Sequence, residues 1–135
     1  MTDVTGPEGL VVYQIGAVAE RLGMSQRTIR HYDDLGIVKP SARTAGGFRL
    51  YTEADVRRFQ LIRPFRSLGI GLDTARSVLQ AMDALELGED PTARLIVTET
   101  LELIATRRSE LKRTLSESVD TQTVLQQALP RTSTV

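Results

Sequence analysis

The sequence predicts a mainly α-helical chain with one short β-hairpin in its first half and a long helix at its C-terminal end. Apolar residues recur at helical spacing in several segments, a Gly-Gly pair separates two short alternating segments, and residues 93–128 contain neither Gly nor Pro. The 135 residues suit one small domain with an appendage. Three Phe, three Tyr and no Trp limit the core, so we expect a partner chain to complete the buried surface.

Apolar spacing and glycine predict the N-terminal elements. Residues 1–10 are polar and contain Gly and Pro, and we expect a flexible arm there. The domain that follows, residues 11–85, begins with a short helix whose apolar stripe comprises Ile15, Val18, Ala19 and Leu22. Gly23 ends this helix, and Ser25 caps a second helix that runs to about Leu35. Two helices joined by a short glycine-containing turn form a helix-turn-helix.

A β-hairpin is predicted after the second helix. The glycine pair at 46–47 lies between short flanks within residues 41–51, which is typical of a hairpin ribbon, or wing. Strand alternation predicts two faces, one with Phe48 and Leu50 and the other with Arg49 and Tyr51.

Two further helices complete the predicted domain. Thr52 and Asp55 have the spacing of a capping box at the start of a third helix. Pro64 lacks an N–H group and is expected to kink or end that helix. A glycine-containing turn at 69–71 leads to a fourth amphipathic helix at 72–85.

A polar linker, residues 86–91, precedes the long helix. The apolar seam of this helix has alternating spacings of four and three, the heptad pattern of a coiled coil, and comprises Val97, Leu101, Ile104, Arg108, Leu111, Leu115 and Ser118. Residues 91–118 would span roughly 42 Å, which favours pairing with a second copy over packing within a small domain. Parallel pairing, antiparallel pairing and packing on the same chain all remain open. We expect residues 92–129 to form the dimerisation helix and a short C-terminal helical segment, with a flexible tail at 130–135.

Charge is divided along the chain although the formal net charge is zero. Residues 10–80 carry eleven Lys and Arg against six Asp and Glu, whereas residues 81–135 carry six against nine. The first half is therefore suited to a polyanion such as nucleic acid, and the second half is not. The alternative is a chance fluctuation of surface charge.

The second helix presents side chains suited to reading double-stranded DNA. Its outward side carries Gln26, Arg27, Arg30, His31 and Asp34, its cap is Ser25, and Thr28 and Tyr32 add hydroxyl groups. A helix of this kind fits the major groove, where Arg, Gln and His reach base edges and hydroxyl groups bind phosphate. The positive end of the helix dipole also attracts phosphate. The alternative is a solvated charged face.

The hairpin adds a second basic element. We expect Arg43, Arg49 and Tyr51, on either side of the tip at Gly47, to follow the DNA backbone beside the groove. The alternative is a surface hairpin in which Arg49 and Tyr51 pack on the second helix. The third helix and the turn after it carry four Arg in residues 57–66, of which one or two are expected to contact phosphate.

No enzyme is predicted. The sequence contains no nucleophile–base pair, phosphate-cradling glycine motif or metal-ligand spacing, and it has no Cys. His31 beside Asp33 and Asp34 is interpreted as part of an exposed helix face. We expect no metal and no cofactor. Neither a signal peptide nor a membrane-spanning run is seen, so we expect a cytoplasmic protein without membrane contact.

Two other functions are compatible with these patterns. In one, the chain is a protein-interaction module that is dimerised by its coiled coil and docks an acidic partner on its basic domain. In the other, a small-molecule effector binds between the dimerisation helix and the opposite domain, near residues 115–129. The sequence does not define the chemistry of such an effector.

Residues 13–79 strongly resemble the MerR family of bacterial transcription regulators. The motifs that carry the resemblance occur in order: IG-x-VA at 15–19, S-x-RT-I-R-x-Y at 25–32, LG-I-x-x-P at 35–40, G-F-R-x-Y at 47–51, DV-x-R at 55–58 and LG-I-x-L at 68–72. The long helix after Asp90 resembles, by position and pattern, the antiparallel dimerisation helix of that family. Three departures are His31 where the family often has Tyr, Gly71 in place of a Ser cap, and Pro64 within the third helix.

The resemblance implies a mainly α winged helix-turn-helix followed by an antiparallel coiled-coil dimer. It implies that the dimer binds an inverted repeat in a promoter and distorts the spacer between promoter elements so that RNA polymerase can engage. It also implies an effector that switches the regulator. On matching positions it assigns DNA contacts to Arg27, Thr28, Arg30 and Tyr32 in the second helix, to Arg43, Phe48, Arg49 and Tyr51 in the first wing, and to Arg66 in a second wing.

Overall fold

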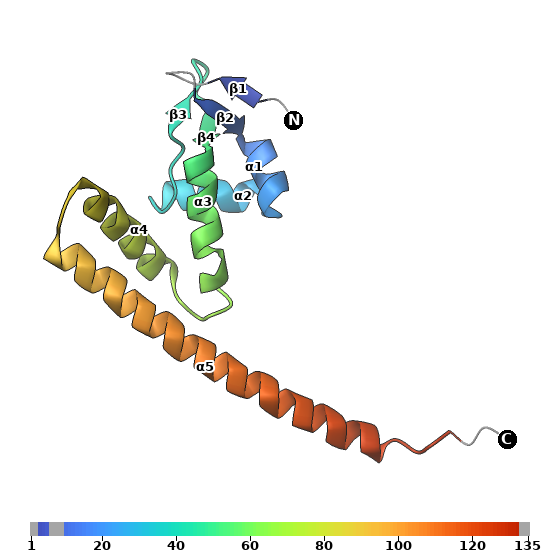
Figure 1. Cartoon of the computed structure of the whole chain (residues 1–135). Helices are drawn as coiled ribbons and strands as arrows, with labels where there is room; N and C mark the ends of the chain where they lie inside the picture. Colours follow the sequence, from blue (N-terminus) through green and yellow to red (C-terminus); the bar gives the residue numbers. More distant parts are fainter. Residues whose placement is uncertain (1–2, 6–9, 133–135) are drawn as a thin grey trace.

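A computed structural model of the chain describes residues 3–5 and 10–132, with side chains described from residue 10 onward. In chain order the elements are β1 (Asp3–Thr5), β2 (Val11–Gln14), α1 (Ile15–Leu22), α2 (Gln26–Asp34), β3 (Ala42–Arg43), β4 (Arg49–Thr52), α3 (Glu53–Ile62), the 3-10 turn η2 (Arg63–Phe65), α4 (Leu72–Leu87) and α5 (Pro91–Ala128). Figure 1 shows a small domain built from β1 to α4, with α5 running alongside α4 and then away from the domain. The predicted mainly α-helical winged helix-turn-helix with a long C-terminal helix is confirmed.

A four-stranded antiparallel sheet in the order β1-β2-β4-β3 forms the wing side of the domain. β1 lies within residues 1–10, so the prediction of a flexible arm is wrong for Asp3–Thr5, which pairs with β2. Residues 1–2 and 6–9 of the predicted arm lie outside the described residues. Main-chain hydrogen bonds to a strand several residues away hold β1 in the sheet, and the polar composition of the segment gives no sign of them.

Local signals place α1 and α2 as predicted. Gly23 ends α1 in the left-handed conformation, with φ 62°, and its N–H group bonds the carbonyl oxygens of the last turn. Ser25 caps α2, because its Oγ accepts from the backbone N–H of Thr28 at 3.1 Å. The turn between the two helices is therefore fixed at both ends.

The core lies where α1, α2, α3, α4 and β4 meet. Its largest fully buried side chains are Val12, Val18, Leu22, Ile29, Val38, Tyr51, Val56, Phe59 and Leu79. The ring of Phe59 lies 5.9 Å from that of Tyr32 in α2 and 6.0 Å from that of Tyr51 in β4. Aromatic pairs at these distances are attractive beyond the area they bury, so α3 holds both the helix-turn-helix and the hairpin.

Pro64 ends α3 as predicted. The helix stops at Ile62, and a single 3-10 turn, Arg63–Phe65, follows. Phe65 is buried, and its carbonyl oxygen accepts from the N–H of Ile70, which closes the turn before α4. α4 then begins after Gly71 without a side-chain cap.

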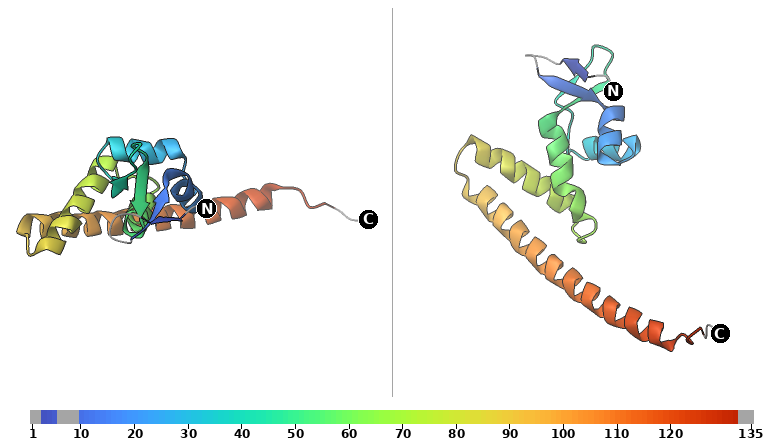
Figure 2. Two further views of the ribbon diagram at one scale, coloured as in Figure 1. Left: turned by 90° about the horizontal axis from the view of Figure 1, so that it is seen from above. Right: turned by 45° about the vertical axis from the view of Figure 1, so that its right-hand side comes forward.

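The C-terminal region differs from the prediction in two ways. α4 continues to Leu87, so the linker is shorter than the predicted 86–91. α5 is one helix of 38 residues, about 57 Å long, and no separate helical segment follows it in the described residues, which end at 132. Figure 2 shows the distal part of α5 extending past the rest of the chain. Among the described residues, no helix has the length and apolarity needed to cross a membrane.

An ion pair joins α1 to α3. Arg21 donates to both carboxylate oxygens of Glu53 at 2.8 Å, and its guanidinium lies 5.2 Å from the centre of the Tyr13 ring. The hydrogen bonds from Arg21 lower the pKa of Glu53 to about 2. Both side chains are partly exposed, so this pair contributes less than about 1 kcal/mol to stability.

Asp55 joins the start of α3 to the segment before β3. Its Oδ2 accepts from Ser41 Oγ at 2.6 Å, from the N–H of Ser41 at 3.1 Å and from the N–H of Thr52 at 2.9 Å. In return, Thr52 Oγ1 accepts from the N–H of Asp55, which completes the predicted capping box. Asp55 is buried, so its charge depends on these donors for stabilisation.

We therefore expect Asp55→Ala to lower the free energy of unfolding by about 2–4 kcal/mol, because it removes a buried carboxylate that accepts three hydrogen bonds and completes the N-cap of α3. Urea unfolding followed by circular dichroism measures this change. Asp73→Ala, which removes a highly exposed carboxylate from the first turn of α4, is the control and should cost less than about 1 kcal/mol. Equal effects of the two substitutions would contradict the role given to Asp55.

Candidate nucleic-acid interface

The outward side of α2 is exposed, as predicted. Ile29 is fully buried beneath the helix, whereas Gln26, Arg27, Arg30 and His31 are exposed. Within the described residues the side chains of Arg27, Arg30 and His31 have no hydrogen bond or ion pair. Arg27, Thr28, His31 and Asp34 line a shallow hollow of about 370 Å³ on this side. Unpaired cationic side chains on an open helix face are available to phosphates and base edges.

The N-terminal turn of α2 brings Ser25 and Thr28 together. Their hydroxyl oxygens lie 2.8 Å apart, in addition to the cap bond to the backbone of Thr28. Tyr32, in contrast, is half-buried with its ring stacked on Phe59. The structure therefore places five of the seven predicted α2 residues on an open face, at Ser25, Gln26, Arg27, Arg30 and His31, while Thr28 and Tyr32 are half-buried.

The hairpin β3–β4 has a tight, exposed tip. The N–H of Gly47 donates to the carbonyl of Thr44, and the N–H of Phe48 donates to Thr44 Oγ1. Gly47 has a φ of 85°, which favours glycine at this position. Phe48 is 72% exposed beside this tip.

Both wing arginines are bound to α2 through the carboxylate of Asp33, a residue that was not among the predicted DNA contacts. Asp33 Oδ2 accepts from Arg49 Nε at 2.7 Å and from Arg43 Nη2 at 3.0 Å. The predicted alternative, in which Arg49 packs on the second helix, is therefore part of the arrangement. The position of Asp33 could have indicated this role, because Asp33 is an acidic residue at the end of a helix and a hairpin with two Arg follows that helix.

Tyr51 is a correction to the predicted set of DNA contacts. Strand alternation placed it beside Arg49 on an open face, but it is 0% exposed and packs against Phe59. β4 is covered on both sides, because Leu50 is also buried. Among the described residues the Tyr51 hydroxyl has no hydrogen-bond partner, and burial raises the pKa of Tyr51 to about 12.

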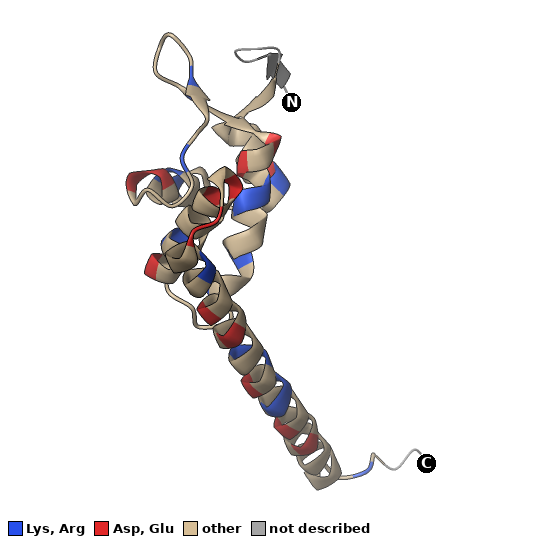
Figure 3. Cartoon of the chain, turned by 60° about the vertical axis from the view of Figure 1, so that its left-hand side comes forward, with Lys and Arg blue, Asp and Glu red and all other residues tan. Residues whose placement is uncertain are grey.

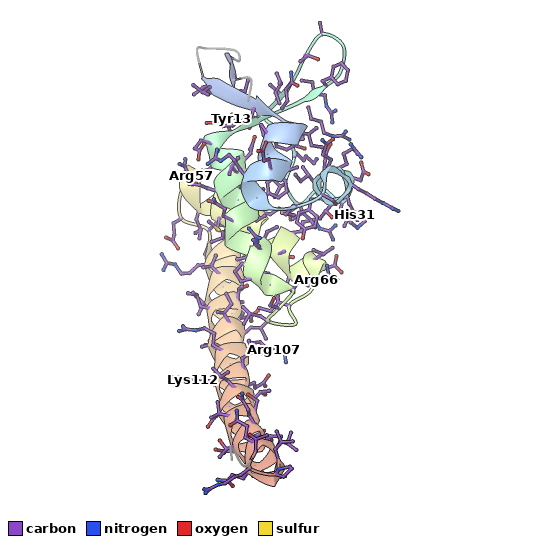
Figure 4. The ribbon with its side chains drawn as sticks, turned by 90° about the vertical axis from the view of Figure 1, so that its right-hand side faces the viewer. Tyr13, His31, Arg57, Arg66, Arg107 and Lys112 are labelled. Atoms are coloured by element: carbon purple, nitrogen blue, oxygen red, sulfur yellow. The ribbon has the colours of Figure 1, made fainter. Side chains whose placement is uncertain are left out.

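The arginines of α3 and η2 fall into two groups. Arg58 is bound to Asp83 of α4, with an Nη1–Oδ1 distance of 2.7 Å, and is unavailable to DNA. Arg57, Arg63 and Arg66 are exposed. Arg66 precedes a turn in which the N–H of Gly69 donates to its carbonyl, and Figure 4 shows Arg66 and His31 on the same side of the domain.

The predicted dimer seam of α5 is divided by the structure. Val97 and Ile104 are half-buried against the core of their own chain, so they do not belong to an open seam. Leu101, Leu111 and Leu115 are 62%, 47% and 65% exposed, and Arg108 is exposed as well. The reason is α4, which packs along the first half of α5 and ends before the second half.

The covered and bare parts of α5 form one continuous stripe. Ala93, Val97, Thr100 and Ile104 face the chain, and the same helical face continues at Leu111, Leu115 and Leu125, which are exposed. Figure 3 shows basic and acidic residues mixed along α5. An apolar stripe flanked by mixed charges is typical of a coiled-coil helix.

Comparison with known proteins finds similarity to helix-turn-helix transcription regulators over most of the chain. The family model described as MerR HTH family regulatory protein matches residues 13–82. The HTH-type transcriptional regulator ZntR of Escherichia coli (strain K12) is 36% identical over 101 residues, which make up 75% of this chain and 72% of that protein. The HTH-type transcriptional activator mta of Bacillus subtilis is 45% identical over 67 residues, 50% of this chain and 26% of that protein.

Coverage of the relatives is uneven. The HTH-type transcriptional activator TipA of Streptomyces coelicolor is 38% identical over 75% of this chain, but this chain spans 37% of TipA. Among solved structures, HiNmlR, described as a MerR family regulator lacking the sensor domain and bound to promoter DNA, aligns with a TM-score of 0.69 and 25% identity. That alignment covers 87% of this chain and 92% of HiNmlR.

The unpartnered hydroxyl of Tyr51 leads to a stability prediction. We expect Tyr51→Phe to leave the free energy of unfolding unchanged or to raise it by up to about 1 kcal/mol at pH 7. The unfolded state loses the Tyr51 proton near pH 10, and the folded state keeps it to about pH 12. Wild-type stability should therefore fall relative to the variant between these pH values. Chemical unfolding at pH 7 and at pH 10–11 measures both effects, and a loss above about 1 kcal/mol at pH 7 would contradict the assignment.

Proposed function

The chain belongs to the MerR family of helix-turn-helix regulatory proteins, and from this we propose that it is a sequence-specific DNA-binding transcriptional regulator that acts as a homodimer on an inverted repeat in a promoter. The observation that carries the proposal is the open face of α2, with Arg27, Arg30 and His31 unpaired beside a basic hairpin. We propose no enzymatic activity, because the relatives to which the chain is similar are named as transcription regulators and activators.

In this proposal α2 lies in the major groove. Arg30, Arg27, His31 and Gln26 reach base edges and neighbouring phosphates from the outward face, and the capped N-terminus with Ser25 and Thr28 lies against a phosphate. Tyr32 supports α2 from its inner side, and only its hydroxyl group is expected to contact DNA. Phosphate contacts set the register of the helix, and base contacts give it specificity.

The hairpin and the turn after η2 serve as two wings. Arg43, Gly47, Phe48 and Arg49 follow the DNA backbone from the first wing, and Arg66 follows it from the second. Phe48 offers its ring to sugars at the groove edge, which accounts for an apolar side chain at an exposed tip.

The bare stripe of α5 pairs with a second copy. Antiparallel pairing fits the charges, because a parallel pair would set Arg107, Arg108 and Lys112, which lie on or beside the stripe, near their own copies. A two-fold dimer of this kind matches an inverted repeat.

The action at the promoter follows from the family assignment. We propose that the dimer distorts the spacer between promoter elements and so permits RNA polymerase to engage. An effector of unidentified chemistry would bind behind the DNA-binding domain and change this distortion. HiNmlR, described as lacking the sensor domain, is bound to promoter DNA in its solved structure, and the alignment of this chain with 92% of HiNmlR supports DNA binding.

The direct test is selection of duplexes from a random-sequence DNA library by the purified chain. We expect enrichment of an inverted repeat, and a binding constant for the enriched duplex that falls steeply with salt as condensed counterions are released. Absence of any enriched sequence and of any mobility shift at low salt would overturn the proposal. Nuclease-resistant co-purification with an acidic protein would then favour the interaction-module alternative.

Arg30 lies on the open face of α2 and tests the proposed contact with bases. We expect Arg30→Ala to weaken binding to the enriched duplex about 10- to 100-fold, because a bidentate contact to a base is lost, and to leave the dimer intact. Arg30→Lys retains the charge, so it should restore binding to random duplex more fully than binding to the enriched duplex. Fluorescence anisotropy and sedimentation measure these quantities. Loss of the dimer in Arg30→Ala would contradict the placement of Arg30.

Leu115 lies on the exposed stripe of α5 and tests the proposed pairing of two copies. We expect Leu115→Asp to weaken dimerisation by at least about 100-fold, because a charge enters the apolar stripe between two copies. Leu95→Asp is the matched control, since Leu95 is 56% exposed but lies roughly 160° away around the helix. Analytical ultracentrifugation measures both variants, with circular dichroism to verify helix content. Equal dissociation of the two variants would contradict pairing through this stripe.

A further inference from the structure

Two like-charged side chains lie opposite each other in the wing. Arg43 of β3 and Arg49 of β4 are direct cross-strand partners in the sheet. Like charges in this position repel and destabilise a two-stranded ribbon. Asp33, from the last turn of α2, places one carboxylate oxygen against both guanidinium groups, at 3.0 Å and 2.7 Å. A residue of α2 therefore offsets the repulsion between the two arginines of the hairpin.

The Asp33 carboxylate is well shielded from solvent. Its side chain is 11% exposed, whereas that of the neighbouring Asp34 is 71% exposed and approaches Arg49 only at 3.9 Å. Charge-assisted hydrogen bonds to a shielded carboxylate hold their geometry better than exposed ion pairs do. The same bonds raise the pKa of Arg49. Asp33 and Asp34 are thus adjacent acids with different structural roles.

Each wing arginine keeps donors that Asp33 does not use. Asp33 binds Arg49 through Nε, which leaves the Nη groups at the outer end of the guanidinium. Asp33 binds Arg43 through Nη2, and Nη1 of Arg43 donates to the carbonyl of Gly47 at 3.3 Å. The carboxylate fixes where the guanidinium groups lie without consuming all of their donors.

We propose that Asp33 is a positioning residue for DNA recognition: it fixes the two wing arginines relative to α2, so that they meet phosphates only when α2 is seated in its cognate groove. This inference rests on the proposed function and deepens it. Arginines on a mobile wing would bind phosphates of any duplex, and phosphate contacts carry no sequence information. Coupling them to the reading helix raises the ratio of specific to non-specific binding.

The test compares Asp33→Asn with Asp34→Asn, which removes the same charge one residue away without breaking the hydrogen bonds to Arg43 and Arg49. For Asp33→Asn we expect affinity for the enriched duplex to fall about tenfold and affinity for random duplex to stay equal or rise, with a steeper salt dependence. For Asp34→Asn we expect both affinities to shift together, with their ratio within about twofold of wild type. Asp33→Glu should recover part of the ratio, because it restores the carboxylate.

A second measurement needs no DNA. Trypsin cleavage after Arg43 and Arg49 should be several-fold faster in Asp33→Asn than in Asp34→Asn, because the wing is released from α2. Unchanged cleavage overturns the positioning role, whatever the DNA result. A parallel loss of specific and non-specific binding in Asp33→Asn also overturns it, because that outcome indicates general damage to the fold. If wild type fails to distinguish the enriched duplex from random duplex, the proposed function fails instead, and the cleavage result still decides the geometry of the wing.

Discussion

The contact of Phe59 with Tyr32 and Tyr51 is the interaction on which the arrangement of the interface depends. One ring on α3 packs against a ring from α2 and a ring from β4, so the reading helix and the wing are both positioned by the same buried side chain. The chain has six aromatic residues in total, and three of them are used at this point. Hydrogen bonds to the carboxylates of Asp55 and Asp33 hold the same elements together at two further points.

The parts of the fold predictable from sequence are those determined by residues a few positions apart. Gly23, Ser25 and Pro64 each act through their own backbone or through the next turn, and each ends or starts a helix where expected. The pairing of β1 with β2 depends on main-chain groups of two segments, and composition carries no record of it. Family motifs identified the interface as a whole, but not which of its residues are buried.

The candidate site shows the same limit at the level of single side chains. The open face of α2 follows from helical spacing, because the buried Ile29 defines the opposite side. Tyr51 could not be placed by strand alternation, since that rule assumes a sheet with one solvated face and β4 is covered on both. Asp33 was seen as a neighbour of His31 in sequence, whereas its partners come from the hairpin ten and sixteen residues further on.

In the proposed dimer, the geometry of the unbroken helix α5 determines the distance between the two DNA-binding domains. With neither Gly nor Pro between 93 and 128, the helix has no hinge that could absorb a change in length. Each inserted residue would rotate the distal stripe by about 100° and advance it by about 1.5 Å, so the phase of the helix is as constrained as its length. In the proposed dimer, the register of α5 would therefore set the separation of the two α2 helices and, with it, the spacing of half-sites that the dimer can span.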